Sequence, residues 1–183
     1  MTSPSLGRLE TTAALNRPDL LAPSVAEALR AWPGAAQVGV AEIDPALADT
    51  AALAEAYALP MSTGANCVIV AGRRDGAERV AACLVRADTR ADVNNLVKRT
   101  LDVRKASFLA MDRAVEESGM EYGGITPLGV PADWPILVDS RIVTLPQIIV
   151  GSGLRRSKIA MPGSVLAALP GAQVVDGLAR AVG

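Results

Sequence analysis

The sequence predicts a single domain of the α/β (α+β) class, built around a mostly antiparallel sheet. Its 183 residues are enough for one domain with one sizeable hydrophobic core. Segments with strand-like and helix-like spacing of apolar residues follow one another in mixed order, and no repeat, low-complexity tract or linker interrupts them. We expect residues 1–18 to be an N-terminal lead-in that is poorly ordered or loosely packed, and residues 19–183 to form the domain.

The individual elements follow from apolar spacing and from turn residues. Leu21, Val25 and Leu29 recur at helical spacing. Asp75-Gly76 lies between two β-branched runs, which is a strong hairpin signal. Helices are expected over 19–32, 49–59, 91–101, 113–119 and 164–169, with Asp112 capping the fourth and Gly119 ending it. Strands are expected over 36–43, 66–74, 78–87, 105–111, 134–143, 146–153 and 157–163, and residues 172–179 fit a last strand or helix.

Composition excludes several classes of protein. The net charge of −1 argues against a broad nucleic-acid surface, because nonspecific affinity comes mostly from Lys and Arg that neutralise phosphates, although a small local contact with RNA is compatible with it. No apolar run approaches the roughly 20 residues of a membrane span, and the N-terminus does not resemble a signal peptide. The two cysteines, Cys67 and Cys83, form no CxxC pattern and suggest no disulfide framework. We therefore expect a cytoplasmic protein without a membrane partner.

The sequence contains no histidine, which restricts the chemistry further. A Ser-His-Asp or Cys-His triad and any His-ligated metal are excluded, and two isolated cysteines cannot close a zinc site. Catalysis would have to use Lys, Asp, Glu, Ser, Thr, backbone groups or the substrate itself. We expect neither a metal nor an organic cofactor.

The stretch EYGGITPLG at 121–129 has no charge after its first residue and no conventional catalytic side chain. Gly123 and Gly124 allow close approach of the backbone, and Pro127 fixes the following turn. Amide N–H groups in such a turn can hold a carbonyl, a carboxylate or an oxyanion. A plain connection between a helix and a strand is the alternative interpretation.

Two apolar strands and a helix are followed by the segments ASFLAMDRAVEESGMEYGGITPLG, PILVDS and IIVGSG. This order of segments along the chain resembles that of the YbaK family. This is the prolyl-tRNA-synthetase-associated domain, whose members hydrolyse wrongly charged aminoacyl-tRNA of the proline type. The resemblance covers about residues 35–180 and implies a curved, mixed sheet with surrounding helices. It also implies trans-editing hydrolysis of an ester, with the aminoacyl-tRNA acceptor end as the partner and an aminoacyl-tRNA synthetase as a second candidate partner.

The resemblance also assigns roles to residues. It implies that the loop backbone polarises the ester carbonyl, while a water, helped by the terminal hydroxyl of the tRNA, attacks it. The implied catalytic residues are Asn66, Gly123, Gly124, Thr126 and Pro127; the implied substrate-binding residues are Cys67, Ile125, Asp139, Gly151, Ser152 and Gly153; and the implied RNA contacts are Arg155, Arg156 and Lys158.

One position departs from the family pattern. The family has Lys followed by Thr at the start of its first long core strand, where this chain has Asn66 and Cys67. Asn donates hydrogen bonds but carries no charge. The chain is therefore interpreted either as an editing deacylase of reduced activity or as a non-catalytic binding module that retains the pocket, and a hydrolase of other esters is a third interpretation.

Several of these residues have structural alternatives. Asp139 fits a turn after a strand as well as a carboxylate at the pocket rim. The segment GSGLRRSK fits a solvated hairpin as well as a phosphate contact by its Arg and Lys side chains. Cys67 fits a small core residue, and Thr126 either donates its hydroxyl into the pocket or stabilises the turn.

Overall fold

The computed structural model describes residues 6–182. Its strands are β1 (Thr12–Ala13), β2 (Gly39–Glu42), β3 (Ala65–Arg74), β4 (Ala77–Arg86), β5 (Thr89–Ala91), β6 (Lys105–Phe108), β7 (Ile136–Asp139), β8 (Ile148–Gly151), β9 (Ser157–Met161), β10 (Ala172–Val175) and β11 (Ala179–Ala181). Its α-helices are α1 (Pro23–Ala31), α2 (Thr50–Tyr57), α3 (Lys98–Thr100), α4 (Met111–Ser118), α5 (Ser140–Val143) and α6 (Gly163–Leu166).

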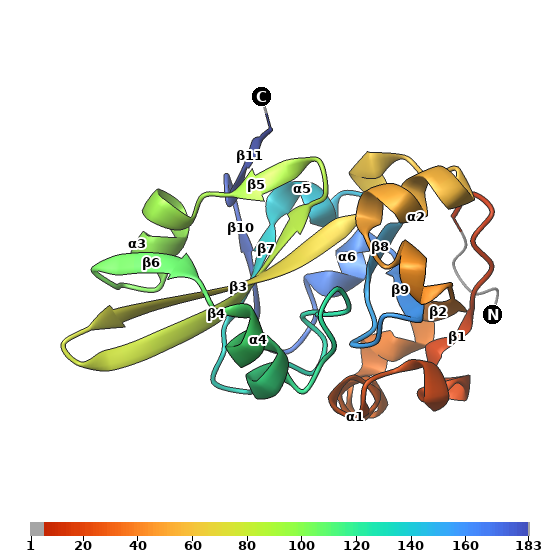
Figure 1. Ribbon diagram of the computed structural model, residues 1–183, viewed down its shortest axis with the longest axis horizontal. Helices are drawn as coiled ribbons and strands as arrows, with labels where there is room; N and C mark the ends of the chain where they lie inside the picture. The colour runs from red at the N-terminus through yellow and green to blue at the C-terminus, as the bar shows by residue number, and fades with distance from the viewer. Residues whose placement is uncertain (1–5, 183) are drawn as a thin grey trace.

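Over the described range the strands form three sheets (Figure 1). The largest has the order β10-β7-β4-β3-β6, the second has the order β1-β2-β9-β8, and β11 pairs with β5 in the third. β7 runs parallel to both β10 and β4, whereas the other pairs are antiparallel. The predicted α/β (α+β) class with mixed, mostly antiparallel pairing is thereby confirmed.

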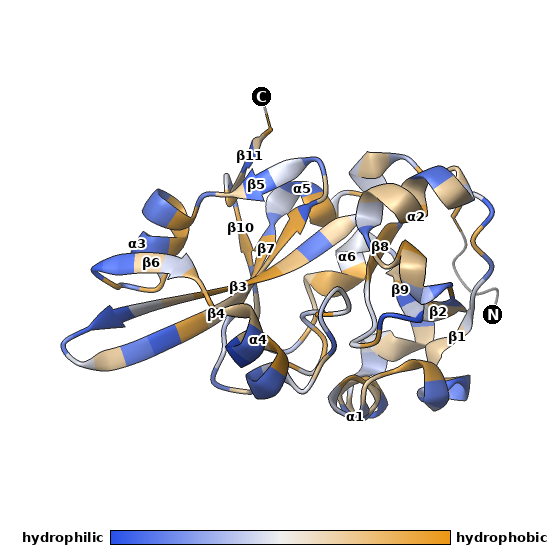
Figure 2. Cartoon of the chain, viewed as in Figure 1, coloured by the Kyte–Doolittle hydropathy of each residue, from blue (hydrophilic) through white to orange (hydrophobic). Residues whose placement is uncertain are grey.

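The predicted hairpin is the longest regular feature of the fold. β3 and β4 pair from Ala65 opposite Arg86 to Arg74 opposite Ala77. The two residues between the strands, Asp75 and Gly76, both have positive φ (52° and 82°), as a type I′ turn requires. The hairpin projects away from the body of the molecule, and its far end is hydrophilic, whereas its inner part is apolar (Figure 2).

Some element boundaries differ from the sequence-based expectation. The helix expected over 91–101 is replaced by β5, a π-helical turn at Val93–Val97 and the single turn of α3. Asp112 does not cap α4: the capping position is Ala110, and the Asp112 carboxylate accepts a hydrogen bond from the N–H of Arg113 (2.8 Å) inside the first turn. Gly119 does end this helix, with the expected positive φ of 68°.

The strand expected over 134–143 ends at Asp139. Its carboxylate accepts a hydrogen bond from the N–H of Arg141 (3.0 Å), and this cap turns the chain into α5. The last expected element, at 172–179, contains the strand β10 and continues into β11. β10 runs parallel to β7, a pairing that local sequence does not reveal.

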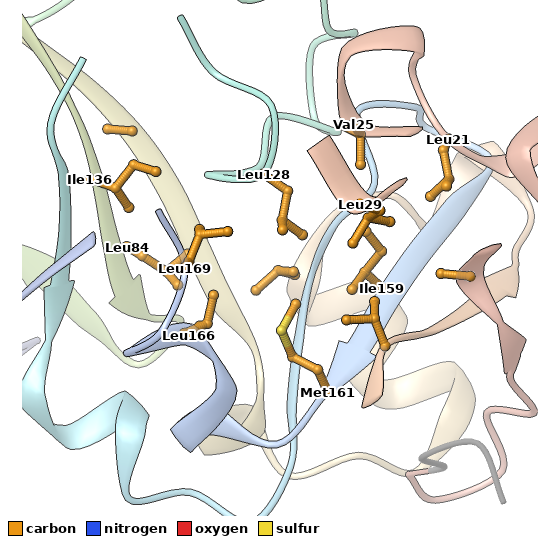
Figure 3. Packing of buried hydrophobic residues seen from close by; sticks show 14 of the residues in the cluster. Leu21, Val25, Leu29, Leu84, Leu128, Ile136, Ile159, Met161, Leu166 and Leu169 are labelled. Atoms are coloured by element: carbon orange, nitrogen blue, oxygen red, sulfur yellow. The ribbon is translucent and has the colours of Figure 1, made fainter. Parts of the chain in front are cut away.

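The main core lies between α1 and the two larger sheets. Figure 3 shows that Leu128, from the stretch after the paired glycines, lies between the group around Leu84 and the group around Leu29. All three side chains are at most 1 % exposed. Leu128 therefore anchors the glycine-containing loop in the core.

Within the described part of the expected lead-in, the chain is packed rather than loose. Leu9 and Ala14 are buried, and β1 pairs with β2. The remainder of the lead-in, residues 1–5, lies outside the described residues. Over residues 6–182, none of the helices has the length and apolarity that crossing a membrane requires.

Candidate functional site

A cavity of about 670 Å³ opens where α2, the start of β3, the end of β8 and the loop after α4 meet. Its wall is mainly apolar, with side chains such as Leu53, Leu59 and Ile149. Seven of the residues assigned to the site from sequence line it: Asn66, Cys67, Gly123, Ile125, Gly151, Arg155 and Lys158. The structure thus brings the start of the first core strand and the glycine loop to one cavity.

The loop contributes backbone groups to this cavity. The N–H of Gly124 donates to the carbonyl oxygen of Glu121 (2.9 Å), and this hydrogen bond closes a turn. Within that turn Gly123 has a φ of 80°, which glycine adopts readily and other residues do not. Within residues 6–182, the amide N–H groups of Gly123 and Ile125 have no hydrogen-bond acceptor. Both residues line the cavity, so its lining contains two backbone donors that have no acceptor within the described chain.

Glycines elsewhere hold this loop in position. A Cβ on Gly151 would lie 2.2 Å from the carbonyl oxygen of Gly124, and a Cβ on Gly124 would lie 2.8 Å from backbone atoms of Leu154. The N–H of Gly153 donates to the carbonyl oxygen of Gly124 (2.7 Å). The end of β8 and the loop after α4 thus touch backbone to backbone.

Asn66 reaches the cavity from β3, and its amide is oriented by a neighbour. The hydroxyl of Thr50, at the first position of α2, donates to Oδ1 of Asn66 (2.9 Å). Within the described chain, Nδ2 of Asn66 has no acceptor. Burial, reinforced by Cys83, raises the pKa of the neighbouring Cys67 thiol, which favours the neutral thiol over the nucleophilic thiolate.

Lys158 extends into the same cavity from β9. Its Nζ donates to the carbonyl oxygen of Ala48 (2.8 Å) and to that of Gly123 (3.3 Å), and the residue is only 6 % exposed. Burial lowers the pKa of the Lys158 ammonium to about 8, with Asp49 opposing and Arg155 adding to the shift. The sequence predicted this lysine as an RNA contact, and the structure places it, buried, in the lining of the cavity.

Arg155 and Tyr122 form the mouth of the cavity. The guanidinium of Arg155 lies 5.9 Å from the centre of the Tyr122 ring and donates to the carbonyl oxygens of Tyr122 (3.0 Å) and Pro45 (3.2 Å). The Tyr122 ring is 59 % exposed. A fixed cation and an open aromatic face therefore stand side by side at the entrance.

Other predicted site residues lie outside the cavity lining and have structural contacts. Asp139 is 1 % exposed and binds the guanidinium of Arg141 (2.8 Å) and the N–H of Ala179 (2.9 Å), so it is a cap and not a carboxylate at the pocket rim. The Ser152 hydroxyl bonds to that of Ser157 (2.7 Å) in the interior. Arg156 donates to the carbonyl oxygen of Asp19 (2.5 Å), away from the cavity.

Gly124, Thr126, Pro127 and Gly153 also fall outside the cavity lining. The polar backbone groups of Gly124 are already paired within the fold, as described above. Thr126 is fully buried, and within residues 6–182 its hydroxyl has no hydrogen-bond partner, so it neither donates into the cavity nor bonds to the turn.

Sequence reasoning missed Thr50, Asp49 and Tyr122 as cavity residues and did not foresee that Lys158 is buried. The signal for Lys158 was available: it is the one charged residue in the run SKIAM, whose other members have small or apolar side chains. Thr50 carried no such signal, because its proximity to Asn66 depends on how α2 packs against β3.

Comparisons with known proteins identify the family of this chain. A family model described as "Aminoacyl-tRNA editing domain" matches residues 44–169, more than half of the chain. No curated protein matches. Among solved structures, a protein described as a "putative trans-editing enzyme for prolyl tRNA synthetase" is similar over 85 % of this chain and 97 % of its own, with 23 % identity and a TM-score of 0.71. A hypothetical protein is similar over 86 % of this chain and 99 % of its own, with 20 % identity and a TM-score of 0.74. The chain belongs to the aminoacyl-tRNA editing domain family.

Proposed function

We propose that this protein is an aminoacyl-tRNA deacylase, which removes a wrongly attached amino acid from a tRNA of the proline type. The observation that carries the proposal is the pair of unpaired amide N–H groups, of Gly123 and Ile125, at the wall of a cavity in an editing-family fold. Preorganised backbone donors of this kind stabilise the charge that develops on a carbonyl oxygen during ester hydrolysis.

The chemistry requires little from side chains. Water adds to the ester carbon while the loop amides hold the carbonyl oxygen; the bond to the ribose oxygen then breaks and that oxygen takes a proton. The terminal hydroxyl of the tRNA helps to position the water. Arg155 at the mouth suits a phosphate of the acceptor end, because its guanidinium is a fixed planar donor.

A second candidate function is a binding module without hydrolysis, and Asn66 is the observation that favours it. Related editing domains carry a lysine where this chain has Asn66, and a charge-assisted hydrogen bond contributes about 1.5–3 kcal/mol against about 1 kcal/mol for a neutral one. A difference of about 1.4 kcal/mol is tenfold in rate. We therefore propose that the deacylase activity is weaker than that of relatives with the lysine.

A deacylation assay tests the proposal. The purified protein is incubated with proline tRNA that carries Ala, Cys or Ser, and correctly charged Pro-tRNA is the specificity control. Asn66→Lys should raise the deacylation rate about tenfold if its neighbours accommodate the longer side chain. Asn94→Lys, at an exposed position outside this cavity, adds the same charge and should change nothing. Binding of the charged tRNA without turnover, by wild type and Asn66→Lys alike, would identify the binding module instead.

A further inference from the structure

The ammonium group of Lys158 is buried without a carboxylate partner. Within residues 6–182, none of the Asp or Glu side chains lies within 4.0 Å of its Nζ. The nearest acidic influence is Asp49, whose carboxylate is already engaged with the N–H groups of Ala51 (2.9 Å) and Ala52 (3.3 Å) as the cap of α2. A buried charge without a counter-ion is costly, so this arrangement needs an explanation.

The two carbonyl oxygens that hold Lys158 come from two neighbouring segments of the cavity lining. Ala48 precedes α2, and Gly123 belongs to the turn with the unpaired amides. An ammonium group has three N–H donors, and these two acceptors use two of them. Within residues 6–182 the third donor has no acceptor, and Lys158 lines the cavity together with Gly123 and Ile125.

We propose that Lys158 contacts the substrate, donating its third N–H to an oxygen of the aminoacyl ester bound in the cavity. This inference rests on the proposed function and names the residue that supplies positive charge to the reacting group. Lys158 stays protonated throughout and forms no covalent bond. It stabilises the carbonyl oxygen as water adds, while the leaving ribose oxygen takes its proton from that water.

The other polar side chains of the cavity do not offer this charge at the same depth. Asn66 is neutral, and Arg155 is committed to two carbonyl oxygens at the mouth. The remaining titratable groups in the lining are Asp49, Cys67 and Tyr122. The guanidinium of Arg155 also lies against the turn but is only partly buried, so Lys158 is the buried cation beside the turn.

The first experiment measures binding of an aminoacyl-adenosine in which an amide replaces the ester, so that turnover is absent. Lys158→Met should weaken binding at least tenfold and slow deacylation at least as much, whereas Lys105→Met, an exposed lysine on β6, should change neither. If the methionine variant does not fold, Lys158→Gln removes the charge and retains a polar N–H donor in a shorter side chain. Unchanged binding and deacylation in a folded Lys158 variant would overturn the proposal.

A second measurement separates a substrate contact from a purely structural role. The sequence has three lysines, so labelling at Cε gives three resonances that lysine variants assign. The Lys158 resonance should titrate near pH 8 in the free protein and at a higher pH with the analogue bound, because an oxygen partner favours the charged form. Two groups should make binding of the analogue depend on pH: the Lys158 ammonium and the amino group of the analogue. In the Lys158→Arg variant only the contribution of the analogue's amino group should remain.

The outcomes distinguish the two proposals. If the wild-type protein neither binds the analogue nor hydrolyses charged tRNA, the proposed function fails, and the role of Lys158 fails with it. If the wild type binds and the Lys158 resonance does not move on binding, only the role of Lys158 is overturned.

Discussion

Gly151 and Gly124 determine how closely the two halves of the site approach each other. Neither residue has a positive φ, so the requirement for glycine at these positions comes from space alone. A Cβ at either position meets backbone atoms, which cannot rotate away as a side chain can. A Gly124→Val substitution would therefore damage folding as much as binding.

We predict that Gly151→Ala lowers the free energy of unfolding by about 2–3 kcal/mol, because overpacking at a backbone contact costs this much. Gly171→Ala is the control: its Cβ meets nothing within 4 Å, and only its positive φ of 81° is penalised, by about 1–2 kcal/mol. Urea unfolding of the two variants measures the difference. A Gly151→Ala protein as stable as the control would show that the loop can move away from β8.

At single residues, the sequence could identify Asn66 and Gly123 because a family pattern and a turn pattern mark them. It left the surroundings of Asp139 and Lys158 open. Both are charged residues in apolar runs, and such a residue can face a cavity, a cap or solvent depending on packing. The hydrogen bonds of Asp139 to Arg141 and Ala179 involve residues up to 40 positions away, which no local pattern reveals.

At the scale of elements, Asp139 links β7, α5 and β11. Although burial opposes ionisation, hydrogen bonds from Arg141 and from the N–H of Ala179 lower the pKa of the Asp139 carboxyl below its usual value. The unfolded chain therefore binds a proton at a higher pH than the folded chain. The stabilisation is present above a pH of about 4 and is lost as the pH falls through the folded-state pKa.

We predict that Asp139→Asn costs about 2 kcal/mol of unfolding free energy at pH 7, the usual contribution of hydrogen bonds to a charged group. The difference from wild type should shrink as the pH falls through the lowered folded-state pKa of Asp139, where the wild-type carboxyl becomes protonated. Asp112→Asn, an exposed position inside α4, serves as the control with little change at either pH. A cost that is independent of pH would mean that side-chain shape, and not charge, matters at Asp139.

The elements that were predicted well are those with local signals. The β3–β4 hairpin carries its own turn dipeptide, and α2 carries its own cap, Asp49, together with regular apolar spacing. β5, β10 and β11 were missed or merged because each is short and is defined by a partner distant in sequence. Their pairing energy comes from the sheet and not from their own residues.

At the scale of the whole molecule, the cavity depends on the N-terminal segment as well as on the domain expected to begin at residue 19. Leu9 packs in a cluster with Leu53, Leu59 and Ile149, and those three residues line the cavity. β1 covers part of β2 by pairing Thr12 with Val40. The segment before residue 19 thus supports the wall opposite the glycine loop.

We predict that a chain beginning at Asp19 is less stable than one beginning at Leu6 by at least about 3 kcal/mol, because it loses a buried leucine and a strand pairing. It should also associate more readily, since removal of β1 leaves the backbone of β2 unpaired along that edge. Thermal unfolding and size-exclusion chromatography of the two chains measure both effects. Binding of the aminoacyl-adenosine analogue should weaken in the shorter chain even where it remains folded, because Leu53 and Leu59 lose the side chain that supports them. Equal stability and equal binding in the two chains would place the domain boundary at residue 19 after all, with the cavity wall held by the remaining sheet alone.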